Sequence, residues 1–212
     1  MNPLSSIICL DNQDSFTYNL VDELAQLGPQ LEVYRNTVST QVILQRLAEC
    51  ASQGPVLLCL SPGPGHPQDA GCLQELVRAA AGRYPILGIC LGFQALVEHL
   101  GGQVDRCHEV VHGKTSALEF NADHPIFAQL GTHLPVARYH SLQAVRMPPQ
   151  VTELARLSTP GGLIPMAFIE PEQRLAGFQF HPESIMTTAG SALLAQTVNY
   201  LMHENEEAQC NN

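Results

Sequence analysis

Four times within residues 1–102, a short apolar run is followed by a stretch in which apolar side chains recur every three or four positions. The stretches have the period of helices with one buried face, and the runs have the length of buried strands. The runs lie at 6–12, 31–36, 55–61 and 85–90. Strand-helix units in series form a parallel sheet with right-handed crossovers. This alternation therefore predicts an α/β fold with a mostly parallel sheet.

The rest of the chain has a different pattern: apolar and polar side chains alternate within each run, and turn residues separate the runs. Such a pattern predicts an antiparallel extension. The runs lie at 109–120, 133–145, 151–157, 163–169 and 174–180. A last amphipathic helix is predicted over 189–203. We predict a single domain over 1–204 and a polar, disordered tail over 205–212.

The formal net charge of −10 limits the partners that the protein can bind. Proteins bind nucleic acids and anionic membranes through clustered Lys and Arg, which displace counterions, so neither partner is expected here. The apolar run at 7–10 is cut by Asp11 and Asp14, and no run approaches the length that spans a bilayer. We therefore expect a cytoplasmic protein that binds small molecules or other proteins.

Seven cysteines are scattered along the chain without a C-x-x-C pair. This indicates neither a disulfide scaffold nor a zinc ribbon. Cys9 and Cys59 fall inside predicted strands and are interpreted as small buried side chains. Cys90 differs, because it lies between Gly88 and Gly92 at the point where a strand becomes a helix.

The resulting G-x-C-x-G pattern has the spacing of the nucleophile elbow of hydrolases, with a thiol in place of the hydroxyl. Glycines remove side chains that would clash in the tight turn, and a helix N-terminus favours thiolate over thiol. The N–H of Leu91 is placed to hold an oxyanion when the sulfur attacks a carbonyl carbon. The pentapeptide alone fits a nucleophile and a buried structural cysteine equally well.

A base for such a nucleophile is found in the segment GFQFHPES. His181 follows a strand-like run, and Pro182 favours an extended backbone at His181. Glu183 is placed to hold one ring nitrogen and to leave the other free for the thiol. A metal site at these two residues is disfavoured, since the zinc deaminase pattern requires a C-x-x-C that the chain lacks.

A third conspicuous stretch is CLSPGPGHP at 59–67, where glycines and prolines follow a predicted strand. The N–H groups of Gly63 and Gly65 are free to bind a carbonyl, a carboxylate or an oxyanion, although a tight turn alone would explain this composition. The dinucleotide and phosphate-loop patterns each lack a required glycine, at Gln68 and His108 respectively. Nucleotide binding is therefore disfavoured.

Six motifs follow one another along the chain, three of them in addition to the segments described above: LDNQDSFTYNL at Leu10, LSPGPGHPQDAG at Leu60, PILGICLGFQAL at Pro85, HGKTSAL at His112, ARYHSL at Ala137 and GFQFHPESIMTTAG at Gly177. In this order, the motifs resemble those of the class I glutamine amidotransferases, and among them the anthranilate synthase component II type. The resemblance covers nearly the whole chain and implies a three-layer, flavodoxin-like fold. The amidotransferase subunit of aminodeoxychorismate synthase shares most of the motifs.

The resemblance implies a catalytic triad of Cys90, His181 and Glu183. It also implies that substrate glutamine binds against three segments of the chain. These segments contain Gly63, Pro64 and Gly65, then Leu91 and Gln94, and finally Ser141 and Leu142. Gln94 lies one helical turn after Cys90, so both can line one pocket.

One position departs from the family pattern, which has histidine where this chain has Phe93. Because the triad histidine is His181, we expect this change to affect a polar contact near the pocket or the partner surface rather than catalysis.

The implied activity is hydrolysis of the L-glutamine side-chain amide, with ammonia as the useful product. A chain with one evident site needs a partner that consumes ammonia. The resemblance implies the chorismate-binding component I of anthranilate synthase, in tryptophan biosynthesis. No cofactor or metal is expected in this subunit, whereas the partner is expected to use Mg²⁺. The alternatives are the aminodeoxychorismate synthase subunit, a free-standing γ-glutamyl thiol hydrolase and a non-catalytic binding subunit.

Overall fold

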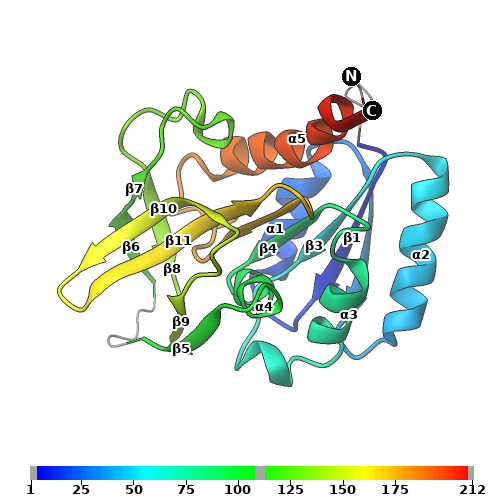
Figure 1. Cartoon of the computed structure of the whole chain (residues 1–212), viewed down its shortest axis with the longest axis horizontal. Helices are drawn as coiled ribbons and strands as arrows, with labels where there is room; N and C mark the ends of the chain where they lie inside the picture. Colours follow the sequence, from blue (N-terminus) through cyan, green and yellow to red (C-terminus); the bar gives the residue numbers. More distant parts are fainter. Residues whose placement is uncertain (1–3, 108–112, 210–212) are drawn as a thin grey trace.

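The structure is a computed structural model that describes residues 4–107 and 113–209. Within this part of the chain, eight strands form one sheet in the order β2-β1-β3-β4-β12-β11-β10-β7 (Figure 1). The parallel strands are β2 (Gln30–Arg35), β1 (Ser6–Asp11), β3 (Val56–Leu60), β4 (Ile86–Ile89) and β12 (Leu175–Phe178). The antiparallel extension is β11 (Gly162–Glu170), β10 (Thr152–Thr159) and β7 (Glu119–Phe120). The predicted mixed sheet is confirmed.

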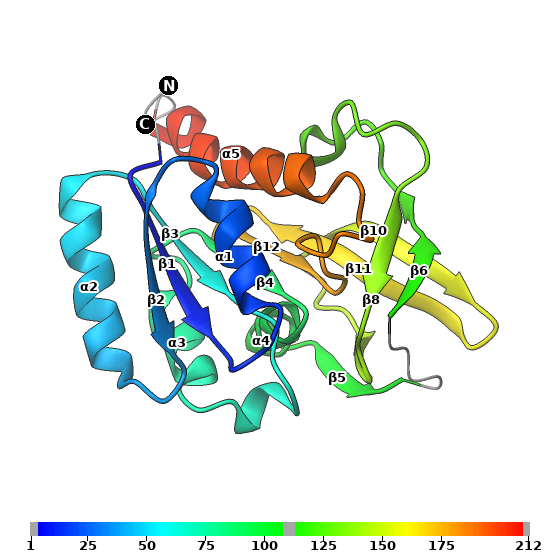
Figure 2. The same ribbon diagram turned by 180° about the vertical axis from the view of Figure 1, so that it is seen from behind.

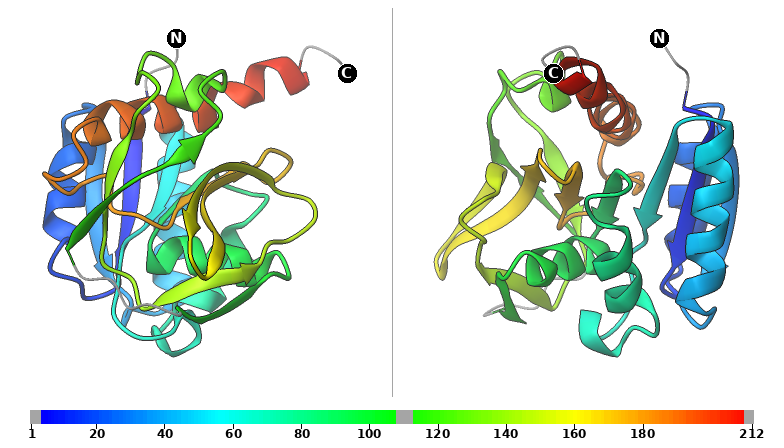
Figure 3. Two further views of the ribbon diagram at one scale, coloured as in Figure 1. Left: turned by 90° about the vertical axis from the view of Figure 1, so that its left-hand side faces the viewer. Right: turned by 45° about the vertical axis from the view of Figure 1, so that its right-hand side comes forward.

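Helices cover both faces of the sheet and give the protein three layers (Figures 2 and 3). One face carries α1 (Thr17–Ala25) and α5 (Gly190–Gln209), and the other carries α2 (Thr40–Gln53), α3 (Leu73–Ala80) and α4 (Leu91–His99). Successive side chains of a strand point to opposite faces. In β1, Ile7 and Cys9 therefore join the core under α1 and α5, while Ile8 and Leu10 join the opposite core. This double burial explains why that run is apolar throughout.

The position of β12 corrects one prediction. The sequence predicts the run at 174–180 as part of the antiparallel extension. In the structure, β12 is antiparallel to β11 but parallel to β4, with Phe178 opposite Ile89. Alternation along a strand reports which faces are buried, whereas the direction of its neighbours is decided by distant parts of the chain. The parallel sheet therefore gains a fifth strand from the C-terminal half.

Two small sheets flank the main one. The first pairs β5 (Gln103–Arg106) with β9 (Leu142–Arg146), and the second pairs β6 (Lys114–Ala117) with β8 (Pro135–Arg138). The predicted strand at 109–120 corresponds to β6 and β7, and its first residues, with His112, lie outside the described residues. Both β5 and β9 contact α4, so this sheet brings the Ser141-Leu142 segment next to the helix that follows Cys90.

The last helix is longer than predicted, because α5 ends at Gln209 rather than at His203. Its predicted core-facing side chains are all buried, namely Leu193, Leu194, Thr197, Val198 and Leu201. The helix enters the segment 205–212, and the division into a domain over 1–204 and a disordered tail stays a prediction. In the described part of the chain, no helix combines the length and the apolar character that crossing a membrane requires.

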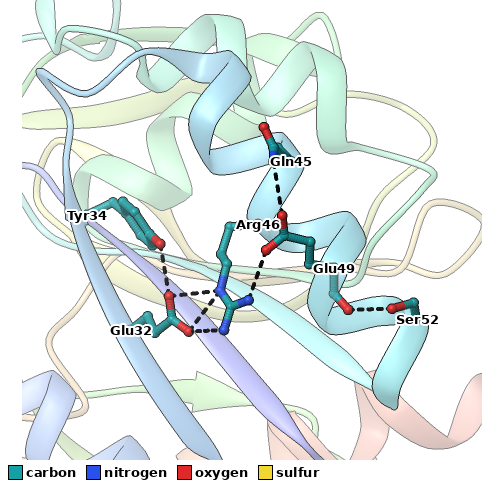
Figure 4. Close-up of polar contacts among 6 residues, drawn as sticks. All are labelled: Glu32, Tyr34, Gln45, Arg46, Glu49 and Ser52. Carbon is teal, nitrogen blue, oxygen red and sulfur yellow. Dashed lines mark hydrogen bonds and ion pairs between the residues drawn. The ribbon is translucent and has the colours of Figure 1, made fainter.

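An ion pair ties the edge strand β2 to α2 (Figure 4). The Nε atom of Arg46 lies 2.9 and 3.0 Å from the two carboxylate oxygens of Glu32. The Tyr34 hydroxyl donates to the same carboxylate at 2.8 Å, and Arg46 also contacts Glu49 at 3.0 Å. The hydrogen bond from Arg46 lowers the pKa of Glu32. Charged side chains on an edge strand also discourage pairing with another sheet.

Candidate active site

Cys90 occupies a strained turn between β4 and α4. Its backbone has φ 51° and ψ −96°, a region that residues with a Cβ rarely adopt. The Cys90 N–H donates to the carbonyl of Phe178 on β12 at 2.7 Å, so the turn is held by the neighbouring strand. Such strain at the end of a central strand is typical of a nucleophile elbow.

The two glycines around Cys90 are required by close backbone contacts. A Cβ atom on Gly88 would lie 2.5 Å from the carbonyl carbon of Gly92. A Cβ atom on Gly92 would lie 2.4 Å from the carbonyl oxygen of Leu60, on β3. Because both neighbours are backbone atoms, neither can rotate away. The spacing of the G-x-C-x-G pattern thus reflects how tightly α4 packs on β3 and β4.

His181 and Glu183 form a buried pair beside this turn. Their Nδ1 and Oε1 atoms are 2.7 Å apart, and the side chains are 3% and 0% exposed. The His181 N–H donates to the carbonyl of Ala137 at 3.1 Å, which fixes the backbone. The other ring nitrogen, Nε2, is buried and makes no hydrogen bond within the described chain. The ring is therefore anchored on one side and available on the other, as the sequence predicts.

Electrostatics link His181 to Cys90. Burial of the ring opposes its protonation, but the Cys90 thiolate and the Glu183 carboxylate outweigh this effect and raise the pKa of His181 well above its usual range. The interaction with the Cys90 side chain is the largest of the effects that raise this pKa, and no other group of the described residues bonds to His181 Nε2. Residues that are far apart in the sequence thus form one electrostatic unit, in which the imidazole of His181 interacts with the side chains of both Cys90 and Glu183.

Two aromatic rings pack against this histidine, and nothing in the sequence predicts this role for them. The ring of Phe16 has its centroid 5.3 Å from that of His181, and Tyr139 meets the imidazole edge-on at 5.1 Å. The two rings also contact each other at 4.7 Å. Both belong to motifs that carry the resemblance, LDNQDSFTYNL and ARYHSL, but nothing local to either motif indicates that it faces His181.

The glycine-proline loop packs against the start of α4. A Cβ atom on Gly63 would meet Leu91 at 2.5 Å and Asn12 at 2.6 Å. Asn12 holds the loop through two hydrogen bonds to Ser61: its backbone N–H donates to the Ser61 hydroxyl and its Nδ2 donates to the Ser61 carbonyl, both at 2.9 Å. The predicted oxyanion donors on Gly63 and Leu91 therefore lie on adjoining segments.

Three of the predicted glutamine-binding residues line one cavity. Gly65, Ser141 and Leu142 surround a space of about 420 Å³, together with His66, Arg106 and Cys107. This is large enough for a small polar ligand. Arg106 and Cys107 could not be predicted as cavity residues, because nothing local in the sequence shows that the end of β5 borders this cavity.

Gln94 and Pro64 differ in their relation to this cavity. The Nε2 atom of Gln94 donates to the Leu142 carbonyl at 3.2 Å, so Gln94 reaches the cavity wall from α4. Pro64 is exposed at the tip of its loop and is not among the residues that line the cavity. The structure therefore brings Gln94 to the predicted binding segment but gives Pro64 no direct place there.

A further polar side chain completes the surroundings of the sulfur. Gln179 is fully buried, and its Nε2 donates to Cys90 Sγ at 3.7 Å. The only signal in the sequence was its place two residues before His181. Within the described residues, no group of three or more His, Cys, Asp or Glu side chains is placed to hold a metal ion.

Phe93 lies away from the cavity. Its side chain is fully buried, and its ring contacts Phe168 with the centroids 5.3 Å apart. Gly177 of β12 packs on the same two rings. The departure from the family pattern therefore falls in the core between α4 and the sheet rather than at the pocket.

Comparison with known proteins agrees with this arrangement. Residues 8–200 match the family model "Glutamine amidotransferase class-I". Anthranilate synthase component 2 of Vibrio parahaemolyticus is 43% identical over 95% of this chain and 99% of its own length. The pyocyanine-specific anthranilate synthase component 2 of Pseudomonas aeruginosa is 47% identical over 89% of this chain and 90% of its own length. A solved glutamine amidotransferase of Thermotoga maritima shares the fold, with 14% identity, a TM-score of 0.66 and coverage of 94% and 98%.

Proposed function

The chain belongs to the class-I glutamine amidotransferases, and on that premise we propose that it hydrolyses L-glutamine at Cys90 and supplies the ammonia to a chorismate-binding partner. One observation carries the choice of residues. His181 is anchored to Glu183 at 2.7 Å through Nδ1, while its Nε2 is left without a hydrogen bond next to the sulfur. That is the arrangement of nucleophile, base and orienting group that acyl transfer requires.

The first half of the reaction forms a thioester. The Cys90 thiolate attacks the side-chain amide carbon of glutamine, a C–S bond forms, and the carbonyl π electrons move to oxygen. The N–H groups of Leu91 and of the loop at Gly63 and Gly65 hold this oxyanion. When the carbonyl reforms, the C–N bond breaks, and His181 gives the proton on Nε2 to the departing nitrogen. Ammonia leaves and a γ-glutamyl thioester remains.

The second half restores the enzyme. Deprotonated Nε2 of His181 accepts a proton from water as the water oxygen attacks the thioester carbon. The C–S bond then breaks, glutamate leaves and the thiolate is regenerated, with the proton on His181. Glu183 keeps the ring in the tautomer and orientation that serve both steps. These steps use only side chains and backbone groups of this chain, and we propose that Mg²⁺ is needed by the partner alone.

The names of the relatives support the choice of partner. Both curated relatives described above are named as component 2 of anthranilate synthase, which implies another component. We propose that this partner is the chorismate-binding component I, and that the complex forms anthranilate for tryptophan biosynthesis. Ammonia becomes ammonium in bulk water at neutral pH, so a docked acceptor site preserves the nucleophilic form.

The substitution Cys90→Ser tests this proposal in the complex with component I. The variant complex is given chorismate with either glutamine or an ammonium salt, and anthranilate is measured by fluorescence. We expect the glutamine-driven reaction to disappear and the ammonium-driven reaction to continue at the wild-type rate. Loss of both reactions, or of neither, would count against the assignment.

Exchanging the partner separates the remaining alternatives. The acceptor is bound by the partner, so this chain is mixed in turn with anthranilate synthase component I and with the chorismate-binding component of aminodeoxychorismate synthase. We expect glutamine-driven product with the first partner. Product with the second alone would assign the chain to the other pathway, and full glutaminase activity without any partner would indicate a free-standing hydrolase.

A further inference from the structure

The buried amide of Gln179 has no role in the steps above, although it contacts the reacting sulfur. Gln179 directly follows β12, and its backbone N–H donates to Met166 of β11 at 2.9 Å. Burying a side-chain amide is costly unless its hydrogen bonds are satisfied, and both ends of this amide are. Its Nε2 donates to Cys90 Sγ at 3.7 Å, and its Oε1 accepts from Gln94 Nε2 at 3.1 Å.

The direction of these hydrogen bonds is set at Leu142, because a backbone carbonyl can only accept. Gln94 must therefore turn Nε2 toward the Leu142 carbonyl, 3.2 Å away. The second N–H of that nitrogen then points to Gln179, which must present its oxygen. The nitrogen of Gln179 is consequently turned toward Cys90 Sγ. A single acceptor thus orients two buried amides and directs a donor to the nucleophile.

The Leu142 carbonyl also accepts a second hydrogen bond, from the ring of His140. Arg138 Nε can only donate, so His140 Nε2 accepts from it at 3.1 Å. The proton of the neutral ring then lies on Nδ1, which donates to the Leu142 carbonyl at 3.0 Å. Burial and the charge of Arg138 lower the pKa of His140 to about 4, so the ring keeps this arrangement at neutral pH.

The hydrogen bonds that run from Leu142 through Gln94 and Gln179 have two consequences, one at Cys90 and one at Gln94. A hydrogen bond to sulfur strengthens when the sulfur becomes negative, so the Gln179 donor favours the attacking form of Cys90. At Gln94, both N–H groups are used, and Oε1 is the atom left to accept from a ligand. An oxygen acceptor at this position would match the α-ammonium group of an amino acid and would repel its carboxylate.

We propose that Gln179 is a positioning residue with two functions: it directs an N–H to the Cys90 thiolate, and it fixes the Gln94 amide so that its oxygen faces the substrate. The inference rests on the proposed function for the identity of the substrate, but the contact with the thiol can be tested without glutamine.

The test compares Gln179→Met with Gln179→Glu in the full chain. Methionine removes both the donor to sulfur and the acceptor for Gln94, whereas glutamate keeps an acceptor and removes the donor. Alkylation of Cys90 by iodoacetamide at pH 7 is followed by peptide mass spectrometry. We expect alkylation to be about tenfold slower in both variants, since each loses a hydrogen bond to a charged group.

Glutamine-driven turnover in the complex with component I separates the two functions. Gln179→Met should lower kcat and raise KM, because the thiol and the Gln94 amide both lose their partner. Gln179→Glu should lower kcat by a similar factor or more while KM stays near the wild-type value. A purely structural role would give no such division between kcat and KM.

Controls for folding are present in the chain. Cys9 and Cys59 are fully buried and react with iodoacetamide only if the protein opens, so their protection in each variant shows an intact core. Gln196→Met is the matched control, since it also removes a glutamine hydrogen bond, to Ala128 at 2.7 Å, and should leave Cys90 alkylation and both kinetic constants unchanged.

The inference is wrong if Gln179→Met keeps the wild-type alkylation rate and kcat. If Gln179→Met or Gln179→Glu exposes Cys9 and Cys59, Gln179→Asn is used in its place and the same rates are measured. A wild-type alkylation rate and kcat in Gln179→Asn would also overturn the inference. Failure of the proposed function gives a different result, because the wild-type complex itself would then form no product from glutamine.

Discussion

Gly92 lies directly against the backbone of Leu60, where a Cβ atom would come within 2.4 Å of the carbonyl oxygen. The helix that follows Cys90 thus packs on the neighbouring strand without an intervening side chain. The position of Cys90 depends on this contact, because Gly92 is two residues further along the same turn.

The first prediction concerns this contact. Gly92→Ala should lower the free energy of unfolding by about 3 kcal/mol or more, because a methyl group is forced against backbone. Urea denaturation measures the change. Gly101→Ala is the control at the end of the same helix, where φ is +86° and no atom lies within 4 Å, so only backbone strain of about 1 kcal/mol is expected. If the two substitutions lowered the free energy of unfolding equally, the close contact between Gly92 and Leu60 would not explain the loss.

The second prediction concerns the charge on His181. In Cys90→Ala the sulfur is absent, so burial and Glu183 alone act on the imidazole, and its pKa should fall relative to the wild type. NMR titration of the ring nitrogens measures this shift. Glu183→Gln should move the same pKa in the same direction. An unchanged titration of His181 in Cys90→Ala would show that the thiol and the imidazole do not interact.

The third prediction concerns stability at acid pH. The folded protein holds the pKa of His140 at about 4, below the ordinary value of about 6.5 in an unfolded chain. Between these two values the unfolded state binds more protons, so the free energy of unfolding falls as the pH is lowered through this window, by about 3 kcal/mol. Urea denaturation at several pH values measures it. His140→Gln should remove this part of the pH dependence. If the free energy of unfolding of the variant changed with pH as steeply as that of the wild type, His140 would not be its cause.

The fourth prediction addresses the departure at Phe93. Phe93→His restores the family residue but buries an imidazole next to Phe168, so it should destabilise the fold by about 2 kcal/mol. The folded fraction should retain its glutamine-driven activity, since the side chain does not reach the cavity. Phe93→Leu controls for lost volume without added polarity and should cost less. A gain of activity in Phe93→His would show that the position acts at the site.

The sequence predicts those parts of the site whose signals are local. The four strand-helix units follow from periodicity, and the glycines around Cys90 indicate the sharp turn before α4. The pair of His181 and Glu183 is readable because both residues lie in one short segment. For these features, the chemistry depends on neighbours in the sequence.

Other parts depend on contacts between distant segments and could not be predicted in this way. Phe16 and Tyr139 meet over His181 only because the residue before α1 and the residue after β8 lie next to each other in the fold. Gln179 contacts Cys90 across the pairing of β12 with β4, and the same pairing makes β12 parallel. The family resemblance supplied a role for Gln94 and Ser141, but the buried amide between Gln94 and the sulfur became apparent only in three dimensions.

The pairing of β4 with β12 also affects when the enzyme can become active during synthesis. On the ribosome, Cys90 and its glycines emerge directly after β1 to β4, whereas the carbonyl of Phe178 that holds the turn emerges only after β5 to β11. The base arrives directly after it. A nascent chain therefore carries a thiol without its base, and closing a loop of this length is slow compared with local folding. Under the proposed function, an incomplete chain that lacks His181 therefore does not hydrolyse glutamine.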